Sequence, residues 1–282
     1  MQINDHLELG RINRLIIDRS TVPGLFLRAL DDKDVLLPNQ YVTENMELES
    51  EIEVFLYTDS EDRLVATTLT PRAMLSQFGF FEVVDTTRFG AFVDWGLPKD
   101  LFVPRSAQKI QFNIGDKRIL YVTYDEQTHR LIGEEKITKH LTHQVSGLHT
   151  NSEVDLLVIA KTPMGFKVIV DHQYEGMLFH NELFEEVKTG DSKKGYVKNI
   201  RSDGNLDISL QPIGAKKSDA ASEKVMALLV ENNGILPYNY KSDAELIKNT
   251  FALSKKNFKR ALTQLQNDGK IEIKETGIYL KS

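Results

Sequence analysis

A strand pattern that recurs three times constrains the fold of this chain more than any other feature. Residues 23–27 and 89–93 both place a phenylalanine two residues after a glycine, and the two segments are 66 residues apart. Ten residues after each glycine an aspartate opens a second apolar run, at 34–38 and again at 100–104. Self-similarity at a fixed period indicates that one structural unit has been copied.

A third copy appears when one inserted residue is allowed, with runs at 165–170 and 176–180. Every copy continues into an acidic or Gly-Asp turn and two further short runs in which apolar and polar residues alternate. Alternation with breaks at Gly, Asn and Asp predicts β-hairpins. About five strands in roughly 70 residues suit a small closed barrel, which leaves no sheet edge exposed.

The charge of the chain is distributed unevenly along these copies. The net charge is −6, which is unfavourable for a nucleic-acid ligand because phosphate is attracted by clustered Lys and Arg. It is −8 over residues 1–70, +1 over 71–145, −3 over 146–215 and +4 over 216–282. We take these segments as four domains, and the gradient predicts that they have different roles.

The last segment has a helical period. Helices are expected over 221–232, before the C-cap signal Asn233-Gly234, over 243–250 behind an N-cap at Ser242, and over 255–267 behind an N-cap at Ser254. A hairpin over 270–274 and 278–281 follows. Three helices and a β-hairpin predict a winged helix, a variant of the helix-turn-helix.

The third of these helices carries a basic surface. Phe258, Ala261, Leu262 and Leu265 are expected on its buried side. Four cations occupy its first two turns without an intervening acid: Lys255, Lys256, Lys259 and Arg260. Because a helix-turn-helix places its reading helix here, the pattern predicts phosphate contacts.

Residues 89–93 resemble the central strand of the S1 RNA-binding domain, an OB-type barrel, and residues 197–210 resemble the closing hairpin of that domain. Residues 236–238 and 254–261 resemble the C-terminal signature of the bacterial conserved virulence factor B family. The resemblance covers nearly the whole chain. It implies a multidomain, mainly β protein with three S1-like five-stranded OB barrels and an α+β winged helix, acting as a cytoplasmic RNA-binding regulator of gene expression.

S1 barrels hold single strands by stacking bases on outward aromatic side chains flanked by cations. In the second barrel, alternation directs Ala91 and Val93 inward and Phe92 outward. The resemblance implies an aromatic platform of Phe89 and Phe92, with Arg88, Arg118 and Arg130 as phosphate contacts.

The other two barrels depart from this pattern. In the first, Pro23 replaces the entrance aromatic, and Phe26 lies among acids that repel phosphate, so we expect a structural or protein-contacting barrel. In the third, Met164 and Lys167 stand in place of the aromatic pair. We nevertheless expect this barrel to contact RNA through Lys167, His180, Lys193, Lys194, Tyr196, Lys198 and Arg201. His180 stands one residue later than the histidine that is common on the third strand of S1 domains.

The sequence offers no catalytic or metal-binding constellation. It has no cysteine, phosphate-binding glycine loop, nucleophile elbow or dinucleotide fingerprint. His140, His143 and His149 have no carboxylate at ligand spacing, and we interpret them as a linker surface. We therefore expect a non-catalytic protein without a cofactor or metal.

The expected partner is single-stranded RNA. Two other classes remain open, namely a DNA-binding regulator led by the winged helix and an interaction scaffold whose acidic N-terminal barrel docks a protein. A short linker around residues 214–217 is expected to bring the basic surfaces of the third barrel and the winged helix together. No apolar run reaches the roughly 18 residues of a membrane span, and no secretory signal is present, so we expect a cytoplasmic protein without a membrane partner.

Overall fold

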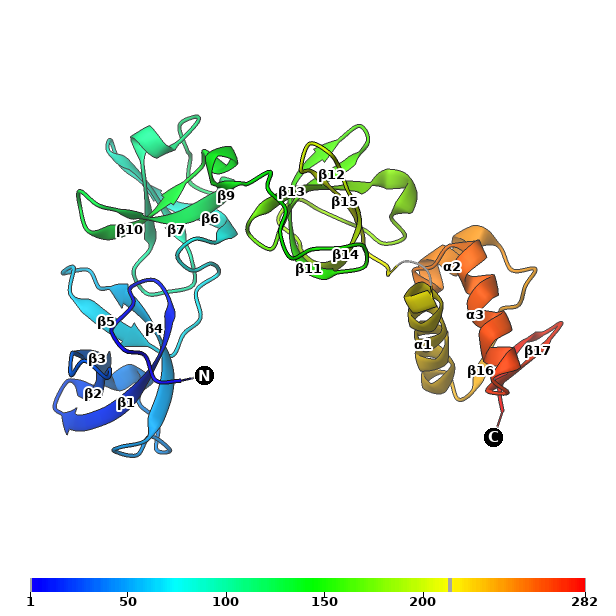
Figure 1. Cartoon of the computed structure of the whole chain (residues 1–282), viewed down its shortest axis with the longest axis horizontal. Coiled ribbons are helices and arrows are strands. Elements are labelled where there is room, and N and C mark those ends of the chain that lie inside the picture. Colours follow the sequence, from blue (N-terminus) through cyan, green and yellow to red (C-terminus); the bar gives the residue numbers. More distant parts are fainter. Residues whose placement is uncertain (1, 213–214, 282) are drawn as a thin grey trace. The chain divides into compact units, whose positions relative to one another are not determined.

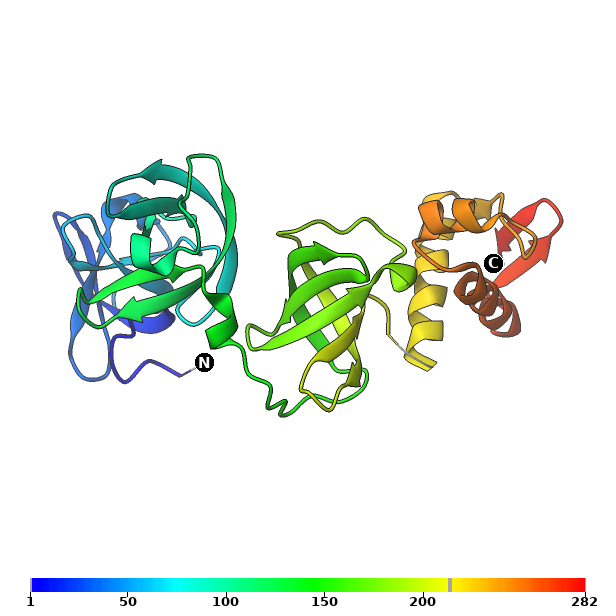
Figure 2. The same ribbon diagram turned by 90° about the horizontal axis from the view of Figure 1, so that it is seen from above.

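The computed structural model describes residues 2–212 and 215–281, and these form three closed five-stranded β-barrels followed by a small helical domain with a three-stranded sheet (Figures 1 and 2). The mainly β, multidomain fold expected from the sequence is confirmed. The chain divides into two compact units, residues 1–140 and 141–282. The first holds two barrels, and the second holds the third barrel and the helical domain.

The three barrels share one connectivity, in which the third strand pairs with the fifth and the fourth strand closes onto the first. Barrel 1 consists of β1 (Ile12–Thr21), β2 (Gly24–Arg28), β3 (Asp34–Pro38), β4 (Glu51–Thr58) and β5 (Leu64–Thr67). Barrel 2 consists of β6 (Phe78–Thr86), β7 (Gly90–Asp94), β8 (Leu101–Pro104), β9 (Lys117–Asp125) and β10 (Arg130–Glu134). Barrel 3 consists of β11 (Glu153–Thr162), β12 (Gly165–Val170), β13 (Tyr174–Phe179), β14 (Ser192–Ile200) and β15 (Leu206–Ser209).

The glycine that opens the second strand of every barrel is required by close packing of the backbone. Gly24, Gly90 and Gly165 each pair with the last residue of the third strand. A Cβ atom at any of them would collide with a carbonyl oxygen of that strand. In all three turns, the hydroxyl of the threonine three residues before the glycine donates a hydrogen bond to the glycine carbonyl. The recurring glycine is therefore required because the second and third strands lie too close together there for any side chain.

Barrels 1 and 2 share a hydrophobic core. Phe55, Tyr57 and Val65 of barrel 1 belong to the same buried cluster as the interior of barrel 2. The ring of Phe55 meets the ring of Trp95 edge-on, with the centroids 5.9 Å apart. Trp95, 3% exposed, donates its indole N–H to the carbonyl of Lys99 at 2.6 Å. Part of barrel 1 is thus buried together with the interior of barrel 2, while a separate cluster around Leu15 and Leu27 forms the core of barrel 1 itself.

The C-terminal domain contains the three expected helices and the expected terminal hairpin. Its elements are α1 (Ala215–Glu231), β16 (Ile235–Leu236), α2 (Ala244–Phe251), α3 (Lys255–Asn267), β17 (Ile271–Lys274) and β18 (Gly277–Leu280), with β18 central in the sheet. Helix α1 lies beside α3 (Figures 1 and 2). Val225 and Leu229 of α1 belong to the same buried cluster as Leu262 and Leu265 of α3. The buried side expected for α3 is confirmed, since Phe258, Ala261, Leu262 and Leu265 are at most 1% exposed.

Three local predictions in this domain were wrong. Helix α1 begins at Ala215 rather than 221, so residues 215–217 of the expected linker belong to its first turn, and Gly214 lies outside the described residues. The N-cap of α2 is Asp243, whose carboxylate accepts from two backbone N–H groups of the first turn. Ser242 instead accepts from the N–H of Asn239 in the preceding turn. The short strand β16 was not expected.

Removal of the cap of α3 should destabilise this domain measurably. The Ser254 hydroxyl accepts from the N–H of Asn257 at 3.2 Å, as the sequence predicted. Ser254→Ala leaves that donor unpaired, and we expect a loss of about 1 kcal/mol in the free energy of unfolding, measured by urea denaturation followed at the helical circular-dichroism signal. Ser254→Asn keeps a side-chain acceptor and should stay within a few tenths of the parent. Equal stabilities of the alanine and asparagine variants would contradict the prediction.

Candidate nucleic-acid interface

An aromatic surface lies on the outer side of β7 and β8 in barrel 2, and we call it the β7–β8 face. Phe92 of β7 and Phe102 of β8 are directly paired across the strands, with ring centroids 5.1 Å apart. Ala91 and Val93 on either side of Phe92 are at most 1% exposed, which confirms the expected alternation. Phe89, at the turn before β7, is 65% exposed. Phe92 and Phe102 thus form an aromatic pair on the outside of the barrel, and Phe89 lies exposed at the turn before β7.

A pocket of about 270 Å³ opens beside these rings and is built by both barrels of the first unit. Phe89, Phe92 and Phe102 line one part of it, and Tyr57 and Thr58 of barrel 1 line another. Asp100 and Leu131 also contribute to its wall. We call it the Phe92 pocket. Its volume is close to the lower end of ligand sites in proteins, roughly 300 Å³, so it suits a single planar ring better than a long chain.

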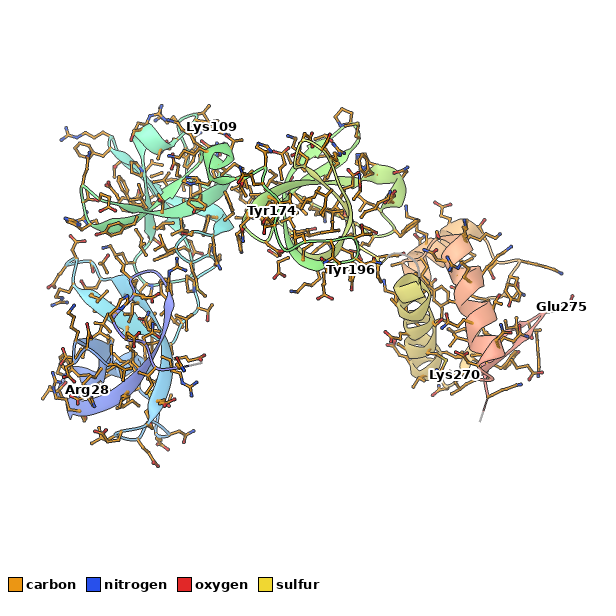
Figure 3. The ribbon with its side chains drawn as sticks, viewed as in Figure 1. Arg28, Lys109, Tyr174, Tyr196, Lys270 and Glu275 are labelled. Carbon is orange, nitrogen blue, oxygen red and sulfur yellow. The ribbon has the colours of Figure 1, made fainter. Side chains whose placement is uncertain are left out.

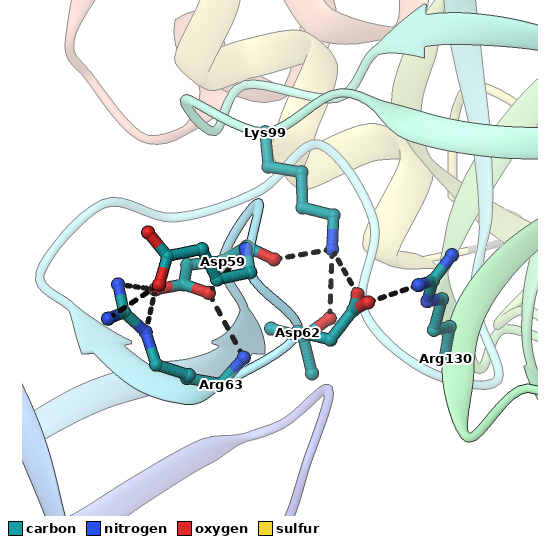
Figure 4. A network of polar contacts seen from close by, with 7 residues as sticks. Asp59, Asp62, Arg63, Lys99 and Arg130 are labelled. Carbon is teal, nitrogen blue, oxygen red and sulfur yellow. Dashed lines mark hydrogen bonds and ion pairs between the residues drawn. The ribbon is translucent and has the colours of Figure 1, made fainter.

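Two of the cations around the pocket already pair with acidic residues of barrel 1. Lys99 donates to Asp62 at 3.1 Å and to the carbonyl of Asp59 at 2.6 Å, and Arg130 also pairs with Asp62 (Figure 4). The hydrogen bond from Lys99, and after it that from Arg130, holds the pKa of Asp62 below its ordinary value, so this carboxylate is ionised at neutral pH. Arg88 is less constrained, with its guanidinium 4.4 Å above the ring of Phe89.

Sequence reasoning missed part of this site. Phe102, Lys99 and Asp100 were not singled out, although Phe102 occupies the same position in the second apolar run as Leu36 in the first copy. Pairing the two runs as a hairpin would have placed Phe102 opposite Phe92. The contribution of Tyr57 had no such signal, because it depends on the packing of two barrels.

The equivalent positions in the other barrels are less suited to stacking. The cross-strand pair is Phe26–Leu36 in barrel 1 and Lys167–Met177 in barrel 3. The guanidinium of Arg19 lies 4.2 Å above the ring of Phe26 and is itself paired with Asp34 at 2.6 Å. Only barrel 2 therefore combines two facing aromatic rings with a pocket among the described residues.

The lysines and the arginine expected to hold RNA in barrel 3 all have acidic partners. Lys167 pairs with Glu175 at 2.7 Å, Lys193 with Glu185 at 3.1 Å, Lys194 with Asp155 at 2.8 Å, Lys198 with Glu182, and Arg201 with Asp207 at 2.6 Å. Tyr196, on the outside of β14 and labelled in Figure 3, donates to Glu153 at 3.4 Å. Each pair lowers the local positive charge, so barrel 3 is less basic than its lysine count suggests.

Two further residues with predicted RNA contacts, Arg118 and His180, have structural contacts. Arg118 is paired with Asp116 at 2.7 Å and Glu135 at 3.5 Å and lies over the ring of Phe112. His180 follows β13, contacts Phe166 edge-on and lies 3.1 Å from the carbonyl of Thr162. Their contacts with RNA stay predictions.

The assignment of His140 to a linker surface was wrong. Its ring stacks on Tyr121 at 3.7 Å and lies 3.0 Å from a Glu134 carboxylate oxygen. Within residues 2–212 and 215–281, no cluster of three or more His, Asp or Glu side chains is arranged to hold a metal ion.

Helix α3 presents a second candidate surface. In the described part of the chain, no carboxylate lies within ion-pair distance of its four cations, Lys255, Lys256, Lys259 and Arg260. The last three are exposed. Lys259 and Arg260 border a shallow depression that continues along Thr263 and Asn267. This surface offers charge and amide groups without aromatic rings, which suits a phosphate backbone.

Comparisons with known proteins agree with this architecture. Residues 9–69 match the S1 domain model and residues 223–280 match the CvfB-like winged helix domain model. The chain is 33% identical over 278 residues to the uncharacterized protein YitL of Bacillus subtilis (strain 168), covering 95% of this chain and 92% of that protein. It is 27% identical over 260 residues to conserved virulence factor B of Staphylococcus aureus (strain N315), covering 89% and 86%.

The chain belongs to the conserved virulence factor B family. A solved structure, a multidomain protein with nucleic acid binding domains from Streptococcus pneumoniae TIGR4, is 24% identical, covers 97% of this chain and 98% of its own, and has a TM-score of 0.42. The S1 and winged helix domains of the present chain support a nucleic-acid-binding role. Both domains are typical of non-catalytic proteins. No helix among the described residues is long and apolar enough to cross a membrane.

Proposed function

We propose that this protein is a non-catalytic RNA-binding regulator of gene expression that holds single-stranded RNA on the β7–β8 face. The observation that carries the proposal is the set of three phenylalanine rings, Phe89, Phe92 and Phe102, gathered around one pocket on the face that OB barrels use for ligands. Aromatic rings that remain partly exposed cost hydrophobic free energy, and stacking with bases recovers it.

The cations supply the electrostatic part of the proposal. Arg88 borders the aromatic rings, and the four cations of α3 form a second backbone-binding surface. Contacts of this kind attract phosphate at any sequence, whereas stacking selects an unpaired strand. The paired lysines and arginine of barrel 3, and Arg118, are not needed for this proposal because carboxylates already neutralise them. A cytoplasmic location follows from the same role and is part of the proposal.

A second candidate ligand is duplex DNA, favoured by one observation. Helix α3 occupies the reading position of a winged helix and has four cations without acidic partners among the described residues. In that case the barrels would serve other contacts, including a protein partner for the acidic barrel 1.

Competition measurements separate these candidates. A fluorescent single-stranded RNA of about 12 nucleotides is bound to the full chain and displaced with unlabelled RNA, single-stranded DNA or duplex DNA of equal length. We expect RNA to displace the probe at the lowest concentration, and log affinity to fall linearly with log salt. Displacement by duplex DNA alone would favour the second candidate. If no nucleic acid binds even at low salt, a protein-interaction scaffold becomes the favoured function.

The ion pairs of Asp62 should weaken RNA binding, because they occupy Lys99 and Arg130 beside the pocket. Asp62→Asn is expected to tighten binding of an all-uridine RNA by about two- to fivefold at low salt, measured by fluorescence anisotropy. Glu61→Gln is the matched control. It removes the same charge from the same turn, but its carboxylate pairs with Arg63 instead. An equal gain in both variants would mean that net charge, not the release of the two cations, is responsible.

A further inference from the structure

One carboxylate of the Phe92 pocket is left without a partner. Asp100 is half-buried, lines the pocket beside Phe102, and among the described residues it has neither a hydrogen-bond donor nor an ion-pair partner. Its sequence neighbour Lys99 extends instead to Asp59 and Asp62 of barrel 1 (Figure 4). Because no protein donor satisfies this half-buried carboxylate, it can accept hydrogen bonds from a ligand that enters the pocket.

The two acids beside Asp100 differ from it in this respect. Asp94 accepts from the guanidinium of Arg72 at 2.6 Å and from the N–H of Gly96 at 2.8 Å. Asp85 accepts from the N–H of Thr86 at 2.7 Å. Burial raises the pKa of Asp100, and the negative charges of Asp94 and Asp85 raise it further. The local field therefore repels phosphate at this end of the pocket and favours an uncharged group that donates hydrogen bonds.

The edges of the four RNA bases match this carboxylate to different degrees. An ionised carboxylate only accepts hydrogen bonds and has two oxygens side by side. Guanine presents two adjacent donors, N1–H and the N2 amino group. Adenine and cytosine present an amino group next to a ring nitrogen that accepts, and uracil presents a single N–H between two carbonyl groups. Only guanine satisfies both oxygens while its ring lies against Phe92 and Phe102.

We propose that the Phe92 pocket is a subsite for one guanine base of single-stranded RNA, stacked on the phenylalanine rings and read by the carboxylate of Asp100. This inference rests on the proposed function and makes it more specific. The turn of barrel 1 that holds Lys99 keeps the ammonium away from Asp100, and so preserves the acceptor. Barrel 1 thereby contributes to base recognition without contacting phosphate.

The test uses the full chain and a set of uridine nonamers that carry one central guanosine, inosine, adenosine or uridine. Anisotropy titrations should show the guanosine oligomer bound at least about fivefold more tightly than the uridine oligomer, as expected for a bidentate base contact. Inosine lacks the N2 amino group and should lie between them. This comparison changes only the RNA, so it needs no variant. Free guanosine monophosphate is titrated as a competitor to distinguish a nucleotide site from an RNA site, and displacement of the oligomer at equal concentration would overturn the RNA assignment.

Asp100→Asn should abolish the preference for guanosine and leave the affinity for the all-uridine oligomer within about twofold of the parent. Asp85→Asn is the matched control, since it removes an equal charge from the same face and should keep the preference. Equal binding of all four oligomers by the parent would overturn the guanine subsite while the RNA-binding proposal stands. Retention of the preference in a folded Asp100→Asn variant would overturn the role of Asp100. Failure of every oligomer to bind would overturn both.

Discussion

Replacing both Phe92 and Phe102 with alanine is expected to weaken binding of a short single-stranded RNA by a factor of about 5 to 150. The two rings face each other across β7 and β8 and line one pocket, so the double variant removes the platform for at least one base. Stacking of a base on an aromatic side chain contributes about 1–3 kcal/mol, and each 1.4 kcal/mol changes the affinity tenfold. The slope of log affinity against log salt should not change, because no phosphate contact is lost.

The control for this prediction is Phe26→Ala, which removes the equivalent ring of barrel 1. That ring is already covered by Arg19, so the affinity should change less than twofold. Far-UV circular dichroism and a thermal melt establish that the variants are folded. A folded double variant with the affinity of the parent would show that RNA is held elsewhere.

Neutralising the exposed cations of α3 should weaken RNA binding to a comparable degree, but here the dependence of affinity on salt should also become weaker. We expect the triple variant Lys256→Gln, Lys259→Gln and Arg260→Gln to lower the salt slope by about 2, since each phosphate contact with a single strand contributes about 0.7. The same relation gives a loss of about 50-fold at roughly 0.15 M salt. The loss should be nearly equal for all RNA sequences, because backbone contacts carry no base information.

The matched control is the triple variant Lys193→Gln, Lys194→Gln and Lys198→Gln in barrel 3. It makes the same change in net charge, but these ammonium groups are paired with Glu185, Asp155 and Glu182. We expect a loss of less than about fivefold. A larger loss from the barrel 3 variant than from the α3 variant would mean that RNA phosphates displace the acidic partners of these lysines. Barrel 3 would then be the main RNA-binding surface.

The sequence was sufficient to predict the elements that depend on local pattern. Alternation with period two placed Ala91 and Val93 inside barrel 2 and Phe92 outside it, because successive side chains of a strand point to opposite faces. The start of α3 at Lys255 and its cap at Ser254 followed from equally local chemistry. The threefold repeat then extended one well-marked strand pair to three barrels.

The composition of the candidate site depended on residues that are distant in sequence. Asp62 pairs with Lys99 and Arg130, which are 37 and 68 residues away. No local pattern announces such a contact, and the shared core around Phe55 and Trp95 is equally non-local. Summed charge was also a poor guide in barrel 3, because the count of lysines says nothing about which carboxylates lie beside them.

The errors within the C-terminal domain arose from neighbouring signals of similar strength. Ser242 and Asp243 are both good caps, and the structure uses the second because its carboxylate reaches two N–H groups. The residues before 221 are polar, so the hydrophobic period that marks a helix does not reveal the first turns of α1.

The position of Trp95 gives this protein a built-in optical reporter. It is the single tryptophan of the chain, it is enclosed against Phe55 of barrel 1, and its ring also borders the Phe92 pocket. Excitation near 295 nm therefore samples one indole in one environment. Separation of barrel 1 from barrel 2 would shift its emission to longer wavelength, whereas a base entering the pocket would quench it without that shift. The two events can thus be told apart in an unlabelled sample.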